Sequence, residues 1–490
     1  MSYRDPSEGS PSLANPAAAL HQQHTSDALA TVKEQADAIA ALAAGGFTPT
    51  PEQQQAIDGI LGFCRQQSGA TFCSFIGPAG TGKSTTARAV RQRLLTAGFR
   101  VGLCAPTHKA CAVLAKACGV PKSDTCTFAS LLGLREKQIK DDVDFVRDWR
   151  SKPKLDQADV WLADEASMLH PKLLALIEDA ADFWTRVIFI GDAAQLSPVK
   201  LGAISPALRF TPSFTLTKVL RHDGAVLDAA TEIRQTAGNR WRPNFTRSQI
   251  GNGSSIFTYA DKREWQHAIL EMATDAQRDN DPDAFRVIAY RNAEVTKINT
   301  AIRRHVYGRQ APAFVEGERL ITHQAVKDPH DHRELAFGSS REIQIIRATP
   351  GELIHSSCAD AKPYRCWDLV VRGDDDEPAR LIRAIDPSHE GRLAIALEQL
   401  KAEALQNTTV HGQDAWMDYW ELRHSFAELQ PFWCLTCHKA QGSQFRNVFV
   451  QGRDFDTANG GVAERRRLWY TAFTRAQRAV HLVADPEVQR

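Results

Sequence analysis

The chain has 490 residues, of which 43% are hydrophobic and 24% are charged, and its formal net charge at pH 7 is +1. This length exceeds what one hydrophobic core serves and predicts about two to four domains of an ordinary globular kind. No apolar stretch approaches the length that spans a bilayer, and the N-terminus lacks the apolar segment of a signal peptide. We therefore expect a cytoplasmic protein with no membrane partner. The near-zero net charge decides nothing about nucleic acid, because a local basic groove vanishes in the sum.

The first 46 residues are rich in Ala, Ser, Pro and Gln, and we expect a flexible N-terminal tail with a short Ala-rich helix over 26–44. The next predicted helix opens at Pro51, with Thr50 as its N-cap. It carries Gln53, whose side-chain amide offers a donor and an acceptor to the edge of an adenine ring. A Gln in a row of three is equally compatible with plain helix surface.

A phosphate-binding pattern follows. An apolar run over 72–76 predicts a buried strand, the motif Gly-x-x-x-x-Gly-Lys-Ser comes next, and a helix is predicted over 85–97. In this strand–loop–helix order, glycine N–H groups and a helix N-terminus face one anion. Lys83 is expected to reach the β- and γ-phosphates, and the Ser84 hydroxyl to help hold Mg²⁺. The loop residues predicted to bind ATP are Gly77, Pro78, Ala79, Gly80, Thr81, Gly82, Lys83, Ser84 and Thr85.

Two segments after this loop have alternative interpretations. Thr107 and His108 follow a second predicted strand, where α/β sheets bind ligands, and they suit either phosphate contact or a simple helix cap. The highly charged segment 135–157 carries Phe145 and Trp149 among polar neighbours. These aromatic rings suit stacking on bases or wedging into a duplex, and they equally suit half-buried packing of a hairpin.

The next two apolar runs end in residues suited to phosphate chemistry. The run over 160–163 leads to Asp164, expected to hold the Mg²⁺ shell, and to Glu165, expected to orient and deprotonate the attacking water. Adjacent acids at a buried strand end are costly unless positive charge meets them, and a metal with the loop lysine would supply that charge. The run over 187–190 leads to Gln195, whose amide is suited to sense a γ-phosphate oxygen.

A second region of alternating helix and strand begins at about residue 215. It contains Arg221, a candidate for stabilising charge on a transferring phosphate. Residues 311–430 lose the clean alternation, and we expect a small β-rich insertion there. The alternation then returns, and Arg475 near the C-terminus is a second candidate of the same kind.

A cysteine pattern lies in this last region. Cys434, Cys437 and His438 match the Cys-x-x-Cys-His signature of covalent haem attachment, and the two cysteines match half of a zinc site. The sequence has neither a second Cys-x-x-Cys at zinc spacing nor an export signal. We therefore expect neither haem nor zinc, and we expect reduced cysteines.

Six blocks, in this order, resemble superfamily 1 DNA helicases of the 5′→3′ branch, and the likeness is strongest to the RecD-like and Dda-type enzymes. The blocks span nearly all of the chain after residue 47. They are Gly77–Ser84, Ala105–Lys109, Asp164–Ser167, Gly191–Val199, Thr436–Ser443 and Tyr470–Arg475. Ser197 and Cys437 depart from the residues common in this family, and neither departure removes a catalytic group.

The resemblance implies an α/β fold with two RecA-like P-loop cores, Mg-ATP between them and single-stranded DNA across their tops. It assigns 47–211 to the first core, with a strand-separating pin at about 135–157. It assigns 212–310 and 431–490 to two parts of the second core, and 311–430 to an inserted small β-barrel.

The same resemblance implies roles for single residues. Gln53 contacts adenine, Gly442 belongs to the ATP site, and Arg221 and Arg475 are paired arginine fingers. With Lys83, Glu165 and Gln195 these arginines form the predicted catalytic set, and Phe145 and Trp149 are the candidates for strand separation. The implied DNA contacts are Thr107, His108, Lys109, Thr127, Asn292, Thr436, His438 and Lys439.

The implied activity is ATP-driven unwinding of duplex DNA by a monomer that moves 5′→3′ on single strands and opens forked duplexes. Replication or recombination proteins are the expected kind of protein partner. Three alternatives stay open: a single-strand translocase that opens no duplex, a nucleotide-gated DNA-binding module, and RNA as the track, since backbone-reading sites discriminate weakly.

Overall fold

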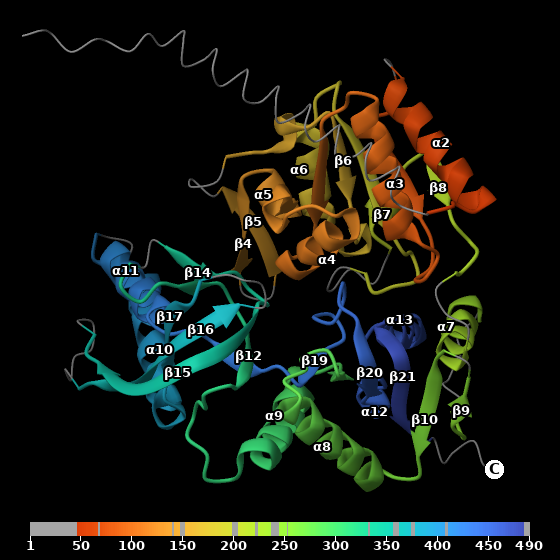
Figure 1. Ribbon diagram of the computed structural model, residues 1–490. Helices are drawn as coiled ribbons and strands as arrows, with labels where there is room; N and C mark the ends of the chain where they lie inside the picture. The colour runs from red at the N-terminus through yellow and green to blue at the C-terminus, as the bar shows by residue number, and fades with distance from the viewer. Residues whose placement is uncertain are drawn as a thin grey trace, which may run out of the picture.

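The computed structural model describes most of the chain after residue 46. The described residues are 47–66, 69–139, 142–147, 152–197, 204–220, 224–236, 245–251, 253–331, 334–355, 362–373, 378–406 and 410–484. The predicted tail, Trp149 and Arg221 lie outside them. Figure 1 shows three bodies: a first core at the top, a second core at the lower right, and a smaller unit at the lower left. Among the described residues, no helix is both long and apolar enough to cross a membrane.

The first core is built on six parallel strands in the order β3-β2-β6-β7-β1-β8. The central strands β6 and β7 are buried at every residue, so they are nearly continuous apolar runs. In β7, Ile188 and Ile190 pack on the side of α2, α3 and α4, whereas Val187 and Phe189 pack on the side of α5 and α6. The elements are α2 (Pro51–Arg65), β1 (Phe72–Ile76), α3 (Lys83–Thr96), β2 (Val101–Ala105), α4 (His108–Cys118), β3 (Thr125–Thr127), α5 (Phe128–Leu131), β6 (Val160–Ala163), α6 (Pro171–Ala180), β7 (Arg186–Gly191) and β8 (Ser213–Thr215).

A short antiparallel hairpin projects from the first core between α5 and β6. It consists of β4 (Leu134–Ile139) and β5 (Asp142–Arg147). The sequence predicts an insertion that continues to residue 157, but Leu155 is buried in the first core and its carbonyl accepts a hydrogen bond from the Trp161 indole at 2.9 Å. The last residues of the predicted insertion therefore belong to the core.

The second core repeats the parallel-sheet design with strand order β19-β11-β20-β21-β10-β9, in which only the edge pair β9–β10 is antiparallel among the described strands. Two stretches of the chain build it, one before and one after the smaller unit in the sequence, and they lie together in one body (Figure 1). The elements are α7 (Ala225–Gln235), β9 (Gln249–Ile250), β10 (Ser255–Tyr259), α8 (Lys262–Arg278), β11 (Phe285–Ala289), α9 (Asn292–Tyr307), β19 (Cys434–Thr436), β20 (Phe445–Val450), α12 (Gly452–Phe455), α13 (Gly461–Phe473) and β21 (Ala476–Val483). The two cores confirm the predicted α/β fold.

The smaller body, which we call the β-rich unit, contains residues 319–431 and a five-stranded antiparallel sheet in the order β17-β16-β15-β12-β18. It also contains two helices that the sequence interpretation missed. The first of them is rich in Leu, Ala and Glu, which favour helix, but its apolar periodicity is weak. Closure of the sheet into a small barrel stays a prediction. The elements are β12 (Arg319–Thr322), β13 (Val326–Lys327), β14 (Leu335–Phe337), β15 (Glu342–Leu353), β16 (Tyr364–Gly373), β17 (Arg380–Ile385), α10 (Glu390–Gln406), α11 (Val410–His424) and β18 (Leu429–Pro431).

Candidate nucleotide site between the two cores

The phosphate-binding loop joins β1 to α3 and has the backbone shape that the motif predicts. Gly80 and Gly82 have φ values of +83° and +84°, which L-residues rarely adopt. Gly82 caps α3 without any side-chain cap, so the first N–H groups of the helix stay available to an anion. The Lys83 ammonium donates to the carbonyls of Gly77 at 2.7 Å and Pro78 at 2.9 Å. A loop with a lysine folded onto it and open N–H groups is suited to receive phosphates.

Gln53 lies behind this loop and braces it. Its side chain is 2% exposed; its oxygen accepts from the Thr50 N–H at 3.0 Å, and its amide nitrogen donates to the Thr81 carbonyl at 3.1 Å. A Cβ atom on Gly82 would lie 2.5 Å from this nitrogen, so the loop approaches Gln53 as closely as glycine allows. The amide is thus engaged within the protein, and its contact with adenine stays a prediction.

The acidic pair ends β6, two strands away from β1 in the sheet. Asp164 accepts a hydrogen bond from the Glu165 N–H at 2.8 Å, and Glu165 adopts a left-handed backbone with φ of +52°. Desolvation and the neighbouring Glu165 charge raise the pKa of Asp164 to about 7, while the Lys83 charge opposes this rise. The Lys83 charge therefore compensates this carboxylate only in part. Its oxygens and the exposed Ser84 hydroxyl are the hard donors that Mg²⁺ prefers, so these residues fit the metal.

A direct contact joins the phosphate loop to the second core. The Tyr470 hydroxyl of α13 donates to Asp192 at 2.6 Å and accepts from the Ala79 N–H at 3.2 Å. The same Ala79 N–H lies 3.0 Å from the Asp192 carboxylate. Burial and the Asp192 charge raise the pKa of Tyr470 well above its usual value, so the hydroxyl keeps its proton. The Ala79 N–H of the phosphate loop therefore contacts both Asp192, which follows β7, and Tyr470 of the second core.

The segment that follows β7 makes further contacts across the cores. The Leu196 N–H donates to the Thr471 hydroxyl at 3.1 Å, and the Gln441 amide donates to the Leu196 carbonyl at 3.1 Å. Next to them, the side-chain oxygen of Gln195 is buried and has no hydrogen-bond partner within the described part of the chain. An unsatisfied acceptor here is suited to bind a water molecule or another donor.

A cleft opens between the phosphate loop and the second core. Its floor is the loop, and its other wall comes from α7 and from the end of α13 with the start of β21. The residues that line it are Pro78, Ala79, Gly80, Val219, Val226, Leu227, Ala230, Thr231, Arg234, Tyr470, Phe473, Thr474 and Ala476. Sequence interpretation missed Arg234. A signal was present, because Val226, Ala230 and Arg234 recur at four-residue spacing and therefore share one face of α7.

The two predicted arginine fingers are placed differently. Arg475 is 3% exposed and binds its own core, donating to the carbonyls of Thr471 and Ser443, each at 3.3 Å, and to the Thr474 hydroxyl at 3.1 Å. Arg221 lies outside the described residues. Its neighbour Leu220 is described, and the Leu220 N–H donates to the Gly80 carbonyl of the phosphate loop at 2.8 Å.

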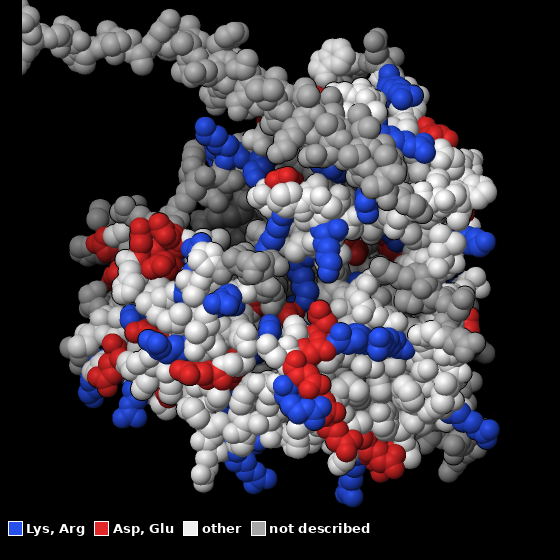
Figure 2. Space-filling model, in the orientation of Figure 1, with Lys and Arg blue, Asp and Glu red and all other residues white. Residues whose placement is uncertain are grey.

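The predicted DNA contacts lie at the carboxyl ends of parallel strands. Thr107 caps α4 after β2, and Thr127 ends β3 and caps α5. In the second core, Asn292 opens α9 after β11, and Thr436 ends β19. Since β2 neighbours β3 and β11 neighbours β19, each core gathers its candidates at one sheet edge. On the face shown in Figure 2, Lys and Arg side chains gather where the first core meets the other two bodies.

The charged members of this set differ in their surroundings. The Lys439 ammonium is buried without a hydrogen-bond partner among the described residues, and burial lowers its pKa. Burial also lowers the pKa of His438. Lys109 instead forms an ion pair with Glu342 of the β-rich unit. Gly442, expected at the ATP site, lies against α4 of the first core, where its Cβ position is 3.3 Å from the Ala110 Cβ.

Phe145 and the two cysteines of the Cys-x-x-Cys pattern are half-buried or buried, whereas Thr85 of the phosphate loop is exposed. Phe145 of the hairpin is half-buried beside the first-core cluster, with its ring centroid 6.3 Å from that of His170. Cys434 and Cys437 are fully buried, and burial raises the pKa of both thiols. Within the described ranges, no group of three or more His, Cys, Asp or Glu is placed to hold a metal ion.

Two family models match the chain. The model described as an AAA domain matches residues 48–242, and the model described as a UvrD-like helicase C-terminal domain matches residues 431–483. The first covers the phosphate loop and the acidic pair, and the second covers Thr436, His438 and Arg475.

Similar proteins include two DNA helicases. The ATP-dependent DNA helicase dda of Enterobacteria phage T4 is 27% identical over 437 residues, which is 83% of this chain and 93% of that protein. The ATP-dependent RecD2 DNA helicase of Deinococcus radiodurans is 31% identical over 197 residues, which is 39% of this chain and 26% of that protein. Among solved structures, a Pif1 helicase from Bacteroides in complex with ADP-AlF3 and single-stranded DNA is 16% identical, with 89% of this chain and 92% of that chain covered and a TM-score of 0.45.

Proposed function

Because the chain belongs to the superfamily 1 helicases of the RecD-like and Dda type, we propose that it hydrolyses Mg-ATP between its two cores to move 5′→3′ along single-stranded DNA and to unwind duplex DNA. The observation that carries this proposal is the contact of Tyr470 with Asp192 and Ala79. It joins the phosphate loop to the second core beside the cleft, so occupancy of the loop and the position of the second core depend on one another.

Hydrolysis rests on residues of the first core. Lys83 exchanges its two loop carbonyls for phosphate oxygens, and Glu165 takes the proton of the attacking water. Ser84 and Asp164 would hold Mg²⁺, which would supply positive charge beside the phosphates. Gln195 supplies an unsatisfied acceptor beside the cores' junction, and this acceptor positions the water.

The second core completes the site by bringing arginine to the transferring phosphate. Arg234 already lines the cleft, and Arg221 and Arg475 are the two fingers that the family resemblance implies. Arg475 reaches phosphate only after leaving the carbonyls of Thr471 and Ser443. Charge-stabilising arginines are worth about 10³–10⁵ in rate, so a site completed only on closure couples turnover to core movement.

A second candidate function is translocation on single strands without duplex opening. The placement of Phe145 favours it, because this half-buried ring packs beside the first core and lies near His170. The same motor chemistry serves both functions, and only measurement of strand separation distinguishes them.

The test of the motor is ATP turnover with and without single-stranded DNA, for the natural chain and for Lys83→Ala. We expect turnover that DNA stimulates and that the variant loses, because the lysine cancels phosphate charge. Absence of turnover in the natural chain would reduce the protein to a nucleotide-gated DNA-binding module, and an active Lys83→Ala chain would refute the assigned site.

A further inference from the structure

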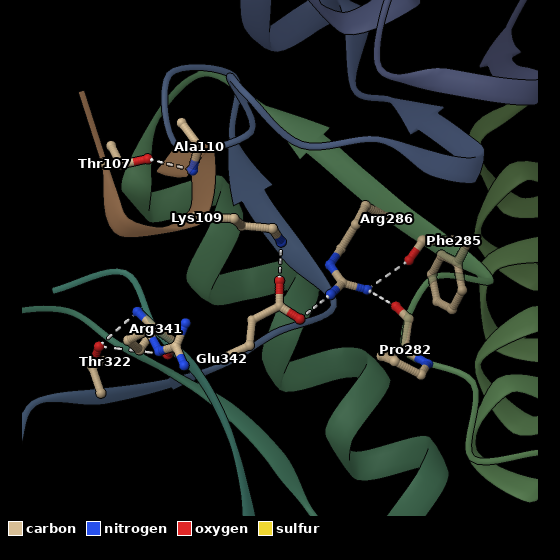
Figure 3. Close-up of polar contacts among 9 residues, drawn as sticks. All are labelled: Thr107, Lys109, Ala110, Pro282, Phe285, Arg286, Thr322, Arg341 and Glu342. Atoms are coloured by element: carbon tan, nitrogen blue, oxygen red, sulfur yellow. Dashed lines mark hydrogen bonds and ion pairs between the residues drawn. The ribbon is translucent and has the colours of Figure 1, made fainter. Parts of the chain in front are cut away.

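One buried carboxylate touches all three bodies of the molecule (Figure 3). Glu342 begins β15 of the β-rich unit; it pairs with the Lys109 ammonium of the first core, and its second oxygen lies 2.8 Å from the Arg286 guanidinium of the second core. We propose that Glu342 is a positioning residue that transmits movement between the two cores to the β-rich unit. This inference rests on the proposed function, because it needs a motor whose cores move.

The Arg286 end of this link is fixed. Arg286 is fully buried in β11, and its guanidinium lies 4.2 Å and 4.7 Å from the ring centroids of Phe432 and Phe445. It also donates to the carbonyls of Pro282 at 2.5 Å and Phe285 at 3.0 Å. A planar cation held between two rings and two carbonyls has no alternative position in water. Glu342 is therefore anchored to the second core.

The Glu342 carboxylate stays charged in spite of its burial. Burial alone raises its pKa, but the charges of Arg286 and Lys109 and their hydrogen bonds outweigh burial and lower the pKa to about 2. Two cations share one anion, so one of them can leave while the other still neutralises it. This arrangement avoids the large penalty of an unpaired buried charge.

Lys109 is the member that can leave. It belongs to α4 of the first core and its side chain is 31% exposed, whereas Arg286 is 0% exposed. Its ammonium also lies 5.3 Å from the Phe445 ring centroid, on the second core. A long side chain that reaches water regains hydration when the pair breaks, so relative movement of the first core makes or breaks this contact at moderate cost.

A second contact joins the same two edges without charge. A Cβ atom on Gly338 would lie 2.8 Å from the His108 ring, so the loop before β15 presses directly on the start of α4. Thr322 holds this loop, because its hydroxyl donates to the Gly338 carbonyl at 2.8 Å and accepts from the Arg341 N–H at 2.9 Å. The β-rich unit thus presents a fixed loop to α4.

The two contacts allow two independent perturbations. Glu342→Gln removes the charge but keeps the size of the side chain, and Gly338→Ala adds one methyl group against His108 at a residue whose φ is not left-handed. Asp368→Asn is the matched control, because it neutralises one carboxylate of an Arg pair that lies wholly within the β-rich unit, with Arg383 at 2.7 Å. Each chain is tested for its melting temperature, for DNA-stimulated ATP turnover, and for base pairs opened per ATP on a forked duplex.

We expect both variants to open at least about fivefold fewer base pairs per ATP, while turnover stays within about twofold and the control matches the natural chain. A fold defect would lower turnover and the melting temperature together, so a selective fall in the ratio reports coupling. If Glu342→Gln does not fold, Gly338→Ala alone decides. An unchanged ratio in the folded variants would overturn the inference. A natural chain without turnover or unwinding would instead refute the proposed function.

Discussion

Two of the regions in which the first core contacts the rest of the molecule differ in chemistry. At the nucleotide cleft, the phosphate loop meets the second core through the Tyr470 hydroxyl and the Ala79 N–H, both of which contact the Asp192 carboxylate. At the start of α4, the contact with the β-rich unit is an ion pair between Lys109 and Glu342. The cleft contact consists of short-range hydrogen bonds that need close alignment, whereas the ion pair tolerates displacement. The first is suited to sensing a ligand and the second to holding bodies that move.

The largest effect is expected at the cleft. Glu165→Gln removes the group that accepts the proton of the attacking water, so we expect ATP turnover to fall by about 10²–10⁴ while nucleotide still binds. Steady-state turnover and nucleotide affinity measure the two quantities. Glu178→Gln on the exposed face of α6 is the control and should leave both unchanged. Near-normal turnover in Glu165→Gln would mean that another residue is the catalytic base.

A smaller effect isolates the contact between the cores. Tyr470→Phe keeps the buried ring and removes the hydroxyl that donates to Asp192, and hydrogen bonds to charged groups are worth about 1.5–3 kcal/mol. We expect DNA-stimulated turnover to fall by about tenfold and turnover without DNA to change less. If both fall equally, the hydroxyl supports the fold of the loop and does not link the cores.

The ion pairs of Glu342 are tested by measuring the free energy of unfolding at acidic pH. A pKa lowered from 4.5 to about 2 means that Glu342 stabilises the folded protein above the unfolded pKa, by about 3 kcal/mol, and that this stability is lost as the pH falls toward 2. The difference in unfolding free energy between the natural chain and Glu342→Gln should therefore stay constant from pH 7 to about 5.5 and shrink below about pH 4.5. Chemical denaturation across this range measures it. A difference that shrinks already near pH 6 would contradict a lowered pKa.

The smallest effect concerns Gln53. As a brace of the phosphate loop, Gln53 should affect all nucleoside triphosphates alike, so Gln53→Ala should weaken ATP and GTP by the same few-fold factor. Contact with adenine predicts a loss for ATP alone. The affinities for ATP and GTP, measured by competition binding to the natural chain and to Gln53→Ala, distinguish the two roles.

Sequence alone predicts the parts of the molecule that depend on local patterns. The phosphate loop, the acidic pair and the parallel strands are marked by glycine spacing, by acids after apolar runs, and by runs buried on both faces. The contacts between the three bodies have no comparable local pattern in the sequence. Glu342 lies 233 residues from Lys109 and 56 residues from Arg286, and in the sequence it is one acid at the start of an ordinary strand.

The missed features have physical explanations of the same kind. The helices of 390–424 have weak apolar periodicity, because they cover an edge of the β-rich unit and not a broad core. Arg234 follows the face of α7 that lines the cleft, but a lone arginine at helical spacing is also ordinary surface. The pairing of Lys109 with Glu342 has no signal in the sequence, because a lysine after a strand end is suited to phosphate and to a carboxylate alike, and its contact with DNA stays a prediction of the family resemblance.

The most direct measurement compares two forked duplexes, one with only a 5′ loading tail and one with only a 3′ tail, in the presence of ATP and Mg²⁺ and with Lys83→Ala as the inactive control. We predict that the natural chain opens the 5′-tailed duplex alone. Opening from the 3′ tail alone would contradict the assigned direction. ATP turnover without opening of either duplex would contradict unwinding and leave translocation on single strands as the function.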